Sequence, residues 1–470
     1  MKYEAVIGLE VHVQLNTNSK IFCGCSTQFG NSPNSNVCPV CTGMPGALPV
    51  LNEEVVNSAI KIGLGLGCKI AQESVFARKQ YFYPDSPKNY QISQYDKPTT
   101  YDGSVVLKNG KKLGITRAHI EEDAGKLIHI QDGSLVDFNR TTMPLIEIVS
   151  EPDMRIPEEA YEYLMIVKQI LRYLEVSDCN MEEGSLRCDA NISIRPKTQE
   201  ELGVKAEVKN LNSFKAVQKA IYYEIERQID VVESGGKVIQ ETRLWDEKKE
   251  ITLSMRSKEE AHDYRYFPEP DLPPLVISTE WINKIKASMP ILPSRRKEKL
   301  MNDYGLSEYD ADVLTNEKDF ADYFETVATR RNAKILANWI MVELLAKLNK
   351  KNQNIQDSPV SAENLAKLIF LIQNNTISGK IAKIVFEEMF LQGKTADLII
   401  KEKNLVQITD TKAIEAAIDD VLEVNKGAVA EYKAGKIKIL GFMVGKVMQK
   451  TQGKANPGLV NKMLKEKLDA

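Results

Sequence analysis

Hydrophobic and polar residues alternate with a period of two near the start of the chain, in the segment EAVIGLEVHVQL. Successive side chains of a strand point to opposite faces of a sheet, so Glu10 and His12 share one face of this predicted strand and the aliphatic residues share the other. The segment MPLIEIVSEPD is a second predicted strand, in which Glu147 lies between two isoleucines and a proline ends the run. The pattern therefore predicts two strands that carry charged side chains among apolar ones.

Three segments of the same region follow the 3.6-residue period of helices. The first begins after Asn52, a helix-capping residue, and has acidic residues in its first turn. The second begins at Pro157, which fits the first turn of a helix. The third follows Ser213, a possible cap at a helix start whose free N–H groups can hold an anion. We therefore expect residues 1–292 to form a mixed-sheet domain with helices.

The hydrophobic pattern changes after the proline-rich boundary that ends this region. Residues 293–404 are leucine-rich with repeated helical periodicity, which predicts an all-helical domain. Residues 405–470 form a third, lysine-rich unit. Because a chain of 470 residues exceeds what one hydrophobic core supports, we predict an α+β protein: a mixed-sheet domain, an all-helical domain and a small basic helical tail domain.

The segment RKQYFYPDSPKNYQISQYDKP, residues 78–98, is rich in aromatic, proline and cationic residues and has neither a helical nor a strand period. This composition is typical of a loop that stacks bases or a nucleotide and contacts phosphates. A self-packed surface loop explains it equally well. We therefore expect a loop here.

Six carboxylates lie among apolar, strand-forming residues, where solvated charges are least expected. An ionised carboxylate inside a sheet is costly unless it is paired or bound to a metal, so the cluster predicts a compensating cation. Oxygen ligands with one histidine suit Mg²⁺ or Mn²⁺. Ordinary salt bridges to Arg117, Lys126 and Arg140 are an alternative that the pattern supports equally. The six are Glu121, Glu122, Asp123, Glu147, Glu151 and Asp153.

Four of the seven cysteines form a CxC and a CxxC pair, at Cys23, Cys25, Cys38 and Cys41. Four thiolates with this spacing suit tetrahedral Zn²⁺, and in a reducing compartment zinc binding is favoured over disulfides. A site closed by four sulfur ligands would be structural, because it leaves no position for a substrate. Free buried thiols or a redox pair are the alternatives.

The charge of the chain is nearly balanced, with 62 lysines and arginines against 65 acidic residues, but it is unevenly distributed. From residue 426 onward ten lysines stand against three acidic residues, an excess typical of proteins that bind a phosphate backbone. A solvated lysine face is the alternative. The candidate nucleic-acid contacts are Lys436, Lys438, Lys446, Lys450 and Lys454.

Targeting and nucleotide-binding motifs are missing from the sequence. The chain opens on a predicted strand, lacks a charged and apolar signal segment, and has no apolar run near about 18 residues. We therefore expect a cytoplasmic location. No Walker motif is present, so any ATP phosphates would be held by metal ions and scattered lysines or arginines.

Long and distinctive segments occur along nearly the whole chain: YEAVIGLEVHVQL, VCPVCTGMPGALPVLN, YFYPDSPKNYQISQYDKP, HIEEDAGK, MPLIEIVSEPD, MEEGSLRCDANISIRP, KNLNSF, DYRYFPEPDLPP and GFMVGKVMQKTQGKANP. In these segments the chain resembles the family of the B subunit of the bacterial aspartyl/glutamyl-tRNA(Asn/Gln) amidotransferase. One departure is Thr142, where the family usually has glycine.

The resemblance implies an enzyme component that uses ATP to phosphorylate the side-chain carboxylate of Glu-tRNA(Gln) and/or Asp-tRNA(Asn). Amidation with glutamine-derived ammonia would then give Gln-tRNA(Gln) or Asn-tRNA(Asn). A glutaminase partner, the A subunit of the complex, would supply the ammonia, and a small C subunit would brace the pair. The family's cradle, helical and basic tail domains would correspond to 1–292, 293–404 and 405–470.

The resemblance also implies roles for individual residues. Glu10, His12, Glu122 and Glu147 would be catalytic and hold Mg²⁺, with Glu121, Asp123 and Glu151 as second choices. The tail lysines would contact the tRNA backbone without reading bases. Residues that would bind ATP or the acceptor end of tRNA are Lys79, Tyr81, Tyr83, Arg187, Asn210 and Ser213.

Two other functions fit part of the pattern. Carboxylates, a metal and a basic tail also describe a metal-dependent RNA-processing nuclease. Such a nuclease would shorten RNA without ATP, whereas the amidotransferase component needs ATP and leaves tRNA intact. A non-catalytic RNA-binding scaffold would bind no Mg²⁺, and Glu122→Ala would leave turnover unchanged.

Overall fold

The computed structural model describes residues 2–255, 264–405, 411–451 and 455–469. It divides into two compact units, Met1–Pro293 and Ser294–Ala470. The first unit is built around one hydrophobic core, and the second contains two separate cores, one before and one after residue 405. The predicted α+β class is confirmed, since the first unit contains a mixed sheet and the second is helical. The exact three-domain boundaries stay a prediction.

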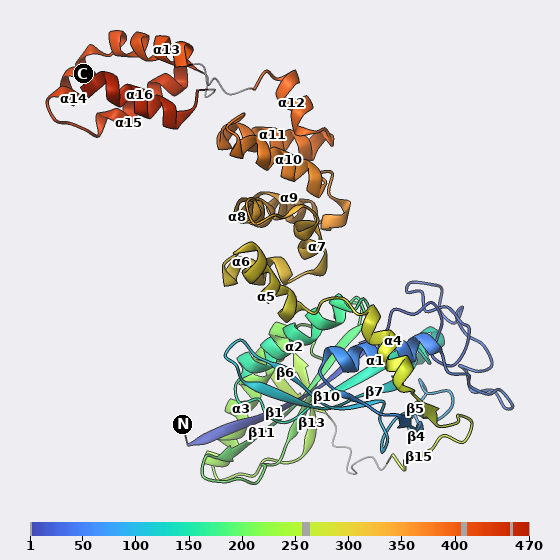
Figure 1. Cartoon of the computed structure of the whole chain (residues 1–470). Helices are drawn as coiled ribbons and strands as arrows, with labels where there is room; N and C mark the ends of the chain where they lie inside the picture. The colour runs from blue at the N-terminus through green and yellow to red at the C-terminus, as the bar shows by residue number, and fades with distance from the viewer. Residues whose placement is uncertain (1, 256–263, 406–410, 452–454, 470) are drawn as a thin grey trace. The chain divides into compact units, whose positions relative to one another are not determined.

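A nine-stranded sheet forms the centre of the first unit (Figure 1), in the order β14-β13-β12-β11-β1-β10-β7-β6-β2. Neighbouring strands are antiparallel except β12 and β13, which are parallel, so the sheet is mixed as predicted. The two predicted strands are confirmed as β1 and β10, which lie side by side. The strands are β1 (Tyr3–Gln14), β2 (Lys69–Ile70), β6 (Thr100–Val106), β7 (Lys112–Glu122), β10 (Pro144–Ser150), β11 (Leu186–Pro196), β12 (Ala206–Lys209), β13 (Glu241–Asp246) and β14 (Ile251–Ser254).

Three helices pack on one another and against this sheet, α1 (Glu53–Gly65), α2 (Pro157–Tyr173) and α3 (Phe214–Glu233). The aliphatic residues of β1 share one hydrophobic core with residues of all three helices. Because side chains alternate along a strand, Glu10 and His12 lie on the face of the sheet that these helices do not cover. The period-two pattern of the first segment is thereby explained.

The start of each helix has the chemistry that the sequence predicts. The Asn52 side chain accepts a hydrogen bond from the amide of Glu54 at 2.9 Å, and the Ser213 side chain accepts one from the amide of Ala216 at 3.0 Å. Pro157 is the first residue of α2. These bonds satisfy amides that a helix leaves free in its first turn. Ser213 therefore has a structural role as a cap.

The prediction of a loop over 78–98 is wrong for two stretches of this segment, which form strands. The segment contains most of β4 (Ala77–Gln80) and all of β5 (Tyr90–Ser93), which pair with each other, and β15 (Phe267–Pro268) adds a third strand. Strands of two to four residues with few aliphatic side chains give no detectable alternation. The other short pairs are β3 (Glu73–Ser74) with β16 (Leu275–Val276), and β8 (Lys126–Ile130) with β9 (Gly133–Asp137).

Thr142 adopts the left-handed conformation that favours glycine, with φ of 60°. Its amide donates to the carbonyl of Asp123 at 2.9 Å, and its carbonyl accepts from the amide of Ile21 at 3.1 Å. The residue is also buried. A β-branched residue is strained at such a φ, so the two backbone bonds hold a conformation that a glycine would adopt freely.

The second unit consists of helices, as the 3.6-residue period predicts. Trp339 is buried in the first of its two cores, and a π-helical turn, η2 (Trp339–Leu344), begins there. No helix in the described ranges is long and apolar enough to cross a membrane. The helices after α3 are α4 (Thr279–Ser288), α5 (Pro293–Tyr304), α6 (Glu308–Thr315), α7 (Lys318–Val327), α8 (Ala333–Asn338), α9 (Leu345–Lys351), α10 (Ala362–Gln373), α11 (Gly379–Gln392), α12 (Ala396–Glu402), α13 (Thr411–Val424), α14 (Lys426–Lys433), α15 (Ile439–Lys450) and α16 (Pro457–Asp469).

Candidate active site

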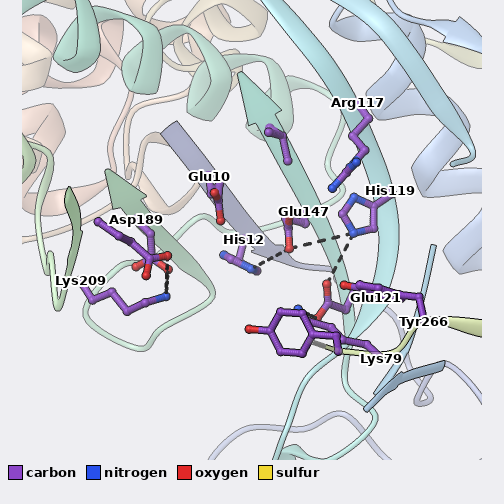
Figure 2. Close-up of a pocket in the computed structure, with 13 residues that line it drawn as sticks. Glu10, His12, Lys79, Arg117, His119, Glu121, Glu147, Asp189, Lys209 and Tyr266 are labelled. Carbon is purple, nitrogen blue, oxygen red and sulfur yellow. Dashed lines mark hydrogen bonds and ion pairs between the residues drawn. The ribbon is translucent and has the colours of Figure 1, made fainter. Parts of the chain in front are cut away.

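A cavity of about 310 Å³ opens on the face of the sheet that carries Glu10 and His12. Its side chains come from β1, β4, β7, β10, β11 and β12 and from the segment that precedes β15 (Figure 2). The cavity is therefore a product of the strand order rather than of one loop. It is lined by Glu10, His12, Lys79, Arg117, His119, Glu121, Glu147, Val149, Asp189, Glu207, Lys209, Tyr264 and Tyr266.

Three neighbouring strands bring two histidines and a glutamate to the same level of the sheet. His12 on β1 lies opposite Glu147 on β10, which lies opposite His119 on β7. His12 Nε2 is 3.2 Å from Glu147 Oε2, and His119 Nε2 is 4.0 Å from the same oxygen. His119 Nε2 is also 3.5 Å from Glu121 Oε2. The four side chains thus form a continuous chain of polar contacts, drawn as dashed lines in Figure 2.

These side chains are buried: Glu121 and His119 are each 3% exposed and Glu147 is 8% exposed. Burial disfavours their charged forms unless neighbouring groups compensate the charge. Burial raises the pKa of Glu147, but the charge of His119 and the hydrogen bond and charge of His12 outweigh this effect, so that pKa lies well below its usual value. Burial lowers the pKa of His12, but its contact with Glu147 raises that pKa above the usual value. Glu147 is therefore an ionised ligand or acceptor at neutral pH.

The same group has the donor atoms of a divalent-metal site. His119, Glu121 and Glu147 each offer one ligand atom, and these atoms lie within 4.8 Å of one another. Carboxylate oxygens with an imidazole suit Mg²⁺ or Mn²⁺. Lys79 Nζ lies 3.3 Å from Glu121 Oε1 and supplies positive charge to the group.

A second group of charges lines the other side of the cavity. Lys209 Nζ lies 2.8 Å from Asp189 and 3.1 Å from Glu207. Glu10 accepts a hydrogen bond from Asn191 Nδ2 at 2.9 Å. Burial and the nearby acidic residues raise the pKa of Glu10. Glu10 is therefore a carboxylate whose charge is poorly compensated, and a cation in the cavity would stabilise it.

Glu122 does not lie in this cavity, so three of the four predicted metal ligands are brought together and the fourth is not. Glu121 and Glu122 are neighbours on β7 and point to opposite faces of the sheet. The Glu122 carboxylate accepts a hydrogen bond from the amide of Ile92 at 2.7 Å and pairs with Lys88. Because one residue of offset exchanges the two faces of a strand, Glu121 occupies the position expected of Glu122.

Among the residues predicted to bind nucleotide or the acceptor end of tRNA, Lys79 lines the cavity. The others have contacts outside the group of residues that line it, and their part in binding stays a prediction. The Tyr81 and Tyr83 rings are 5.7 Å apart, Arg187 lies 3.0 Å from Asp123, Asn210 Nδ2 donates to the Trp245 carbonyl at 3.1 Å, and Ser213 caps α3.

Asp123 and Glu151, which were second choices as metal ligands, contact other protein groups. Asp123 lies 3.0 Å from Arg187 and 3.5 Å from Arg140, so the salt-bridge alternative holds for this acid. Glu151 accepts a hydrogen bond from the Thr116 hydroxyl at 2.7 Å. Both carboxylates therefore have protein donors where they lie.

Several residues of the cavity were not predicted as site residues from the sequence, among them His119, Glu207, Tyr264 and Tyr266. His119 and Glu121 alternate along β7 as Glu10 and His12 do along β1, so the same period-two pattern would have found His119. Glu207 sits on a strand of four residues, too short for a pattern. The two tyrosines follow a segment without periodicity, and only the tertiary structure places them here.

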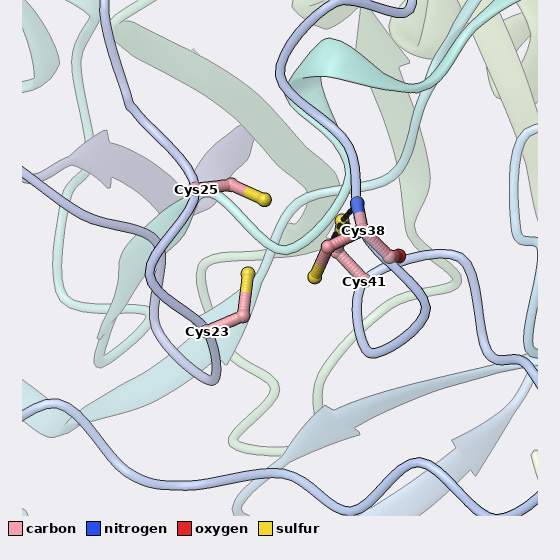
Figure 3. A group of neighbouring side chains, drawn as sticks. All are labelled: Cys23, Cys25, Cys38 and Cys41. Atoms are coloured by element: carbon pink, nitrogen blue, oxygen red, sulfur yellow. Dashed lines mark hydrogen bonds between the residues drawn. The ribbon is translucent and has the colours of Figure 1, made fainter.

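The four cysteines of the predicted zinc motif lie together (Figure 3), with ligand sulfurs within 4.8 Å of one another. None of the four forms a disulfide. The amide of Cys38 donates to Cys41 Sγ at 3.0 Å. A hydrogen bond from Cys23 and the charge of Lys20 help lower the pKa of Cys41 to about 5 despite its burial. The cluster thus provides sulfur ligands from two separate turns, at least one of them a thiolate at neutral pH.

The tail lysines differ in their surroundings. Lys436 and Lys450 each pair with an acidic residue of the tail, and Lys446 Nζ lies 5.6 Å from the centroid of an aromatic ring. Lys438 precedes α15. Lys454 lies outside the described residues. Lys446 and Lys450 lie one helical turn apart, and the pairing of Lys450 with Asp420 offsets the repulsion between their charges.

Comparison with known proteins identifies the family. Residues 5–283 match the model of the GatB/GatE catalytic domain, and residues 322–468 match that of the GatB domain. A protein of Carboxydothermus hydrogenoformans that is named as the B subunit of aspartyl/glutamyl-tRNA(Asn/Gln) amidotransferase is 58% identical over 99% of both chains. Proteins with the same name from Caldanaerobacter subterraneus and Brevibacillus brevis are each 56% identical, over 100% of this chain and 100% and 99% of theirs. The chain belongs to the GatB family of amidotransferase subunits.

The geometry predicts which carboxylates bind a divalent cation. Glu147→Gln and Glu121→Gln should each weaken Mn²⁺ binding to the chain by about tenfold or more, because each removes an ionised donor from the same group. Glu122→Gln is the matched control, one residue away on the other face, and should leave Mn²⁺ affinity unchanged. Isothermal titration calorimetry measures all three, and a loss confined to Glu122→Gln would contradict the assignment.

Proposed function

We propose that this chain is the component that activates and amidates the side-chain carboxylate of glutamate or aspartate on misacylated tRNA. The end-to-end identity with proteins named as the B subunit of aspartyl/glutamyl-tRNA(Asn/Gln) amidotransferase carries this proposal. The cavity of carboxylates, histidines and lysines supports it as the place of reaction. The nuclease and scaffold alternatives are not favoured by these relatives.

The proposed reaction has two steps. The carboxylate of the tRNA-borne residue attacks the γ-phosphorus of ATP, the bond to the β-phosphate oxygen breaks, and ADP leaves. Ammonia then attacks the carbonyl carbon of the acyl phosphate, phosphate departs with its bridging oxygen, and the nitrogen loses a proton. The first step is required because a carboxylate is a poor electrophile, whereas an acyl phosphate has a good leaving group.

The residues of the cavity fit these needs. His119, Glu121 and Glu147 would hold Mg²⁺, with His12 and Glu10 beside them. When bound, Mg²⁺ would neutralise phosphate oxygens and orient the reacting groups. Lys79 and Lys209, already held by carboxylates on either side of the cavity, would keep positive charge near the phosphates. No Walker motif is needed in such a site.

The proposal includes partners and a location. The relatives are named as one subunit of a larger enzyme, and we propose a complex with two further proteins. One is a glutaminase, the A subunit, which releases ammonia from glutamine, and the other is a small C subunit. The complex would work in the cytoplasm, where charged tRNA is used. The chain alone contributes the kinase and transamidation site.

We also propose that the cysteine cluster holds one structural Zn²⁺. Four sulfurs within 4.8 Å of one another suit a closed tetrahedral site. Metal analysis of the purified chain should find about one zinc per chain, and Cys41→Ser should reduce this content and lower the temperature of unfolding. Cys68→Ser, a change at a cysteine outside the cluster, is the control and should retain the zinc. A zinc-free wild-type chain with the same stability would refute the site.

The amidation reaction tests the main proposal. The chain reconstituted with its glutaminase and small partner proteins, glutamine and Mg-ATP should convert radiolabelled Glu-tRNA(Gln) or Asp-tRNA(Asn) to the amide and release ADP. Glu147→Gln should reduce the rate by about a hundredfold or more, since it removes an ionised group from the centre of the cavity. Thin-layer chromatography of the released amino acid also identifies the preferred tRNA.

The alternatives predict different outcomes in the same assay. Shortened RNA without ATP would identify a nuclease. Intact charged tRNA and no ADP from the wild-type complex would identify a scaffold. Glu122→Gln again serves as the control, because its carboxylate lies on the other face of the sheet.

The basic tail is proposed to bind the tRNA backbone. Lys446→Ala combined with Lys450→Ala should weaken tRNA binding and reduce the slope of log affinity against log salt by about one to two, because each phosphate contact releases counterions. Affinity for ATP should not change. Lys69→Ala combined with Lys97→Ala removes the same charge from exposed positions of the first unit and is the control. An unchanged salt slope would show that Lys446 and Lys450 do not contact the tRNA backbone.

A further inference from the structure

We propose that Arg117 binds a substrate oxyanion in the cavity, either the side-chain carboxylate of the aminoacyl-tRNA or the terminal phosphate of ATP. This inference rests on the proposed function and assigns a residue to substrate binding within it. The inference rests on how the positive charges of the cavity are paired: both lysines contact carboxylates, whereas Arg117 contacts none among the described residues.

Arg117 is placed beside the reacting groups by β7. It precedes His119 by two residues and Glu121 by four, so the three side chains share one face of the strand. Its neighbour across β10 is Val149, which also lines the cavity. Figure 2 shows the Arg117 guanidinium next to the His119 ring. A group held there would lie next to the proposed metal ligands.

Both lysines that line the cavity have carboxylate partners. Lys79 Nζ is 3.3 Å from Glu121, and Lys209 Nζ is 2.8 Å from Asp189. Among the described residues, Arg117 has no carboxylate within 4.0 Å, and its Nε is buried without a hydrogen-bond partner. Arg117 is therefore the arginine or lysine of this cavity whose charge and buried donor are left for a ligand.

An aromatic ring sets the orientation of this side chain. The Arg117 guanidinium carbon lies 6.0 Å from the centroid of the Tyr95 ring, and Tyr95 stacks on Tyr266 with centroids 4.3 Å apart and 7° between the planes. A guanidinium that packs on an aromatic face keeps its N–H donors at the edge free. Those donors then match two oxygens of one carboxylate or phosphate group.

The charge of the cavity explains why such a residue is needed. Five carboxylates line it, against Lys79, Lys209 and Arg117 and two histidines. Both substrates of the proposed reaction are anions and would be repelled by an acidic wall. A cation without an internal partner attracts them without breaking an existing ion pair.

Two variants of Arg117 in the reconstituted complex test the inference. Arg117→Gln should lower kcat/KM for amide formation by about a hundredfold, and Arg117→Lys should recover part of this loss, since it restores the charge but not the paired donors. A raised KM for aminoacyl-tRNA with unchanged ATP affinity would identify the carboxylate as the ligand. Weaker binding of ATP, measured by calorimetry without tRNA, would identify the phosphate.

Lys112→Gln, which removes one positive charge from the exposed end of the same strand, is the matched control and should behave as wild type. Unfolding temperatures show whether the variants are folded, and Arg117→Lys preserves the test if Arg117→Gln is not. Wild-type kcat/KM and ATP affinity in a folded Arg117→Gln or Arg117→Lys complex would overturn the inference alone. A wild-type complex that forms no amide would overturn the proposed function and this inference with it.

Discussion

The cost of burying charge is the constraint on which the first unit depends. Its central strands carry an apolar face under three helices and a charged face on the other side. An unpaired charge in such a place would destabilise the fold. The antiparallel register reduces this cost by placing His12, Glu147 and His119 in one row, so that Glu147 lies between two protonatable neighbours. The fold and the candidate active site thus share one arrangement of strands.

That arrangement also determines how the cavity can meet its substrates. Most of its positive charges are engaged with carboxylates, which keeps the free protein compensated. An anionic carboxylate and an anionic phosphate must nevertheless approach each other for phosphoryl transfer. In the proposed reaction, Mg²⁺ on the ionised carboxylates would supply part of the positive charge for this approach. Arg117, the arginine of the cavity without a carboxylate partner among the residues that the structure describes, would supply the rest.

The elements around this cavity were predicted to different degrees. Strands β1 and β10 and the caps at Asn52 and Ser213 were predicted because their signals are local: alternation, a proline, and a side chain that bonds a nearby amide. The loop prediction at 78–98 was wrong because β4 and β5 are stabilised by pairing with each other and with β15, which follows much later in the chain. Such pairing leaves little trace in the composition of either partner.

The sequence by itself determined the kinds of chemistry present: carboxylates within strands, four clustered cysteines, and a lysine-rich tail. These follow from residue type and short spacing. Only the tertiary structure decided which groups lie together. It placed Glu121 rather than Glu122 in the cavity, added His119 and two tyrosines, and left Arg117 without a carboxylate partner in the described part of the chain. The reason is that strand register and side-chain direction depend on contacts between distant segments, which no local pattern specifies.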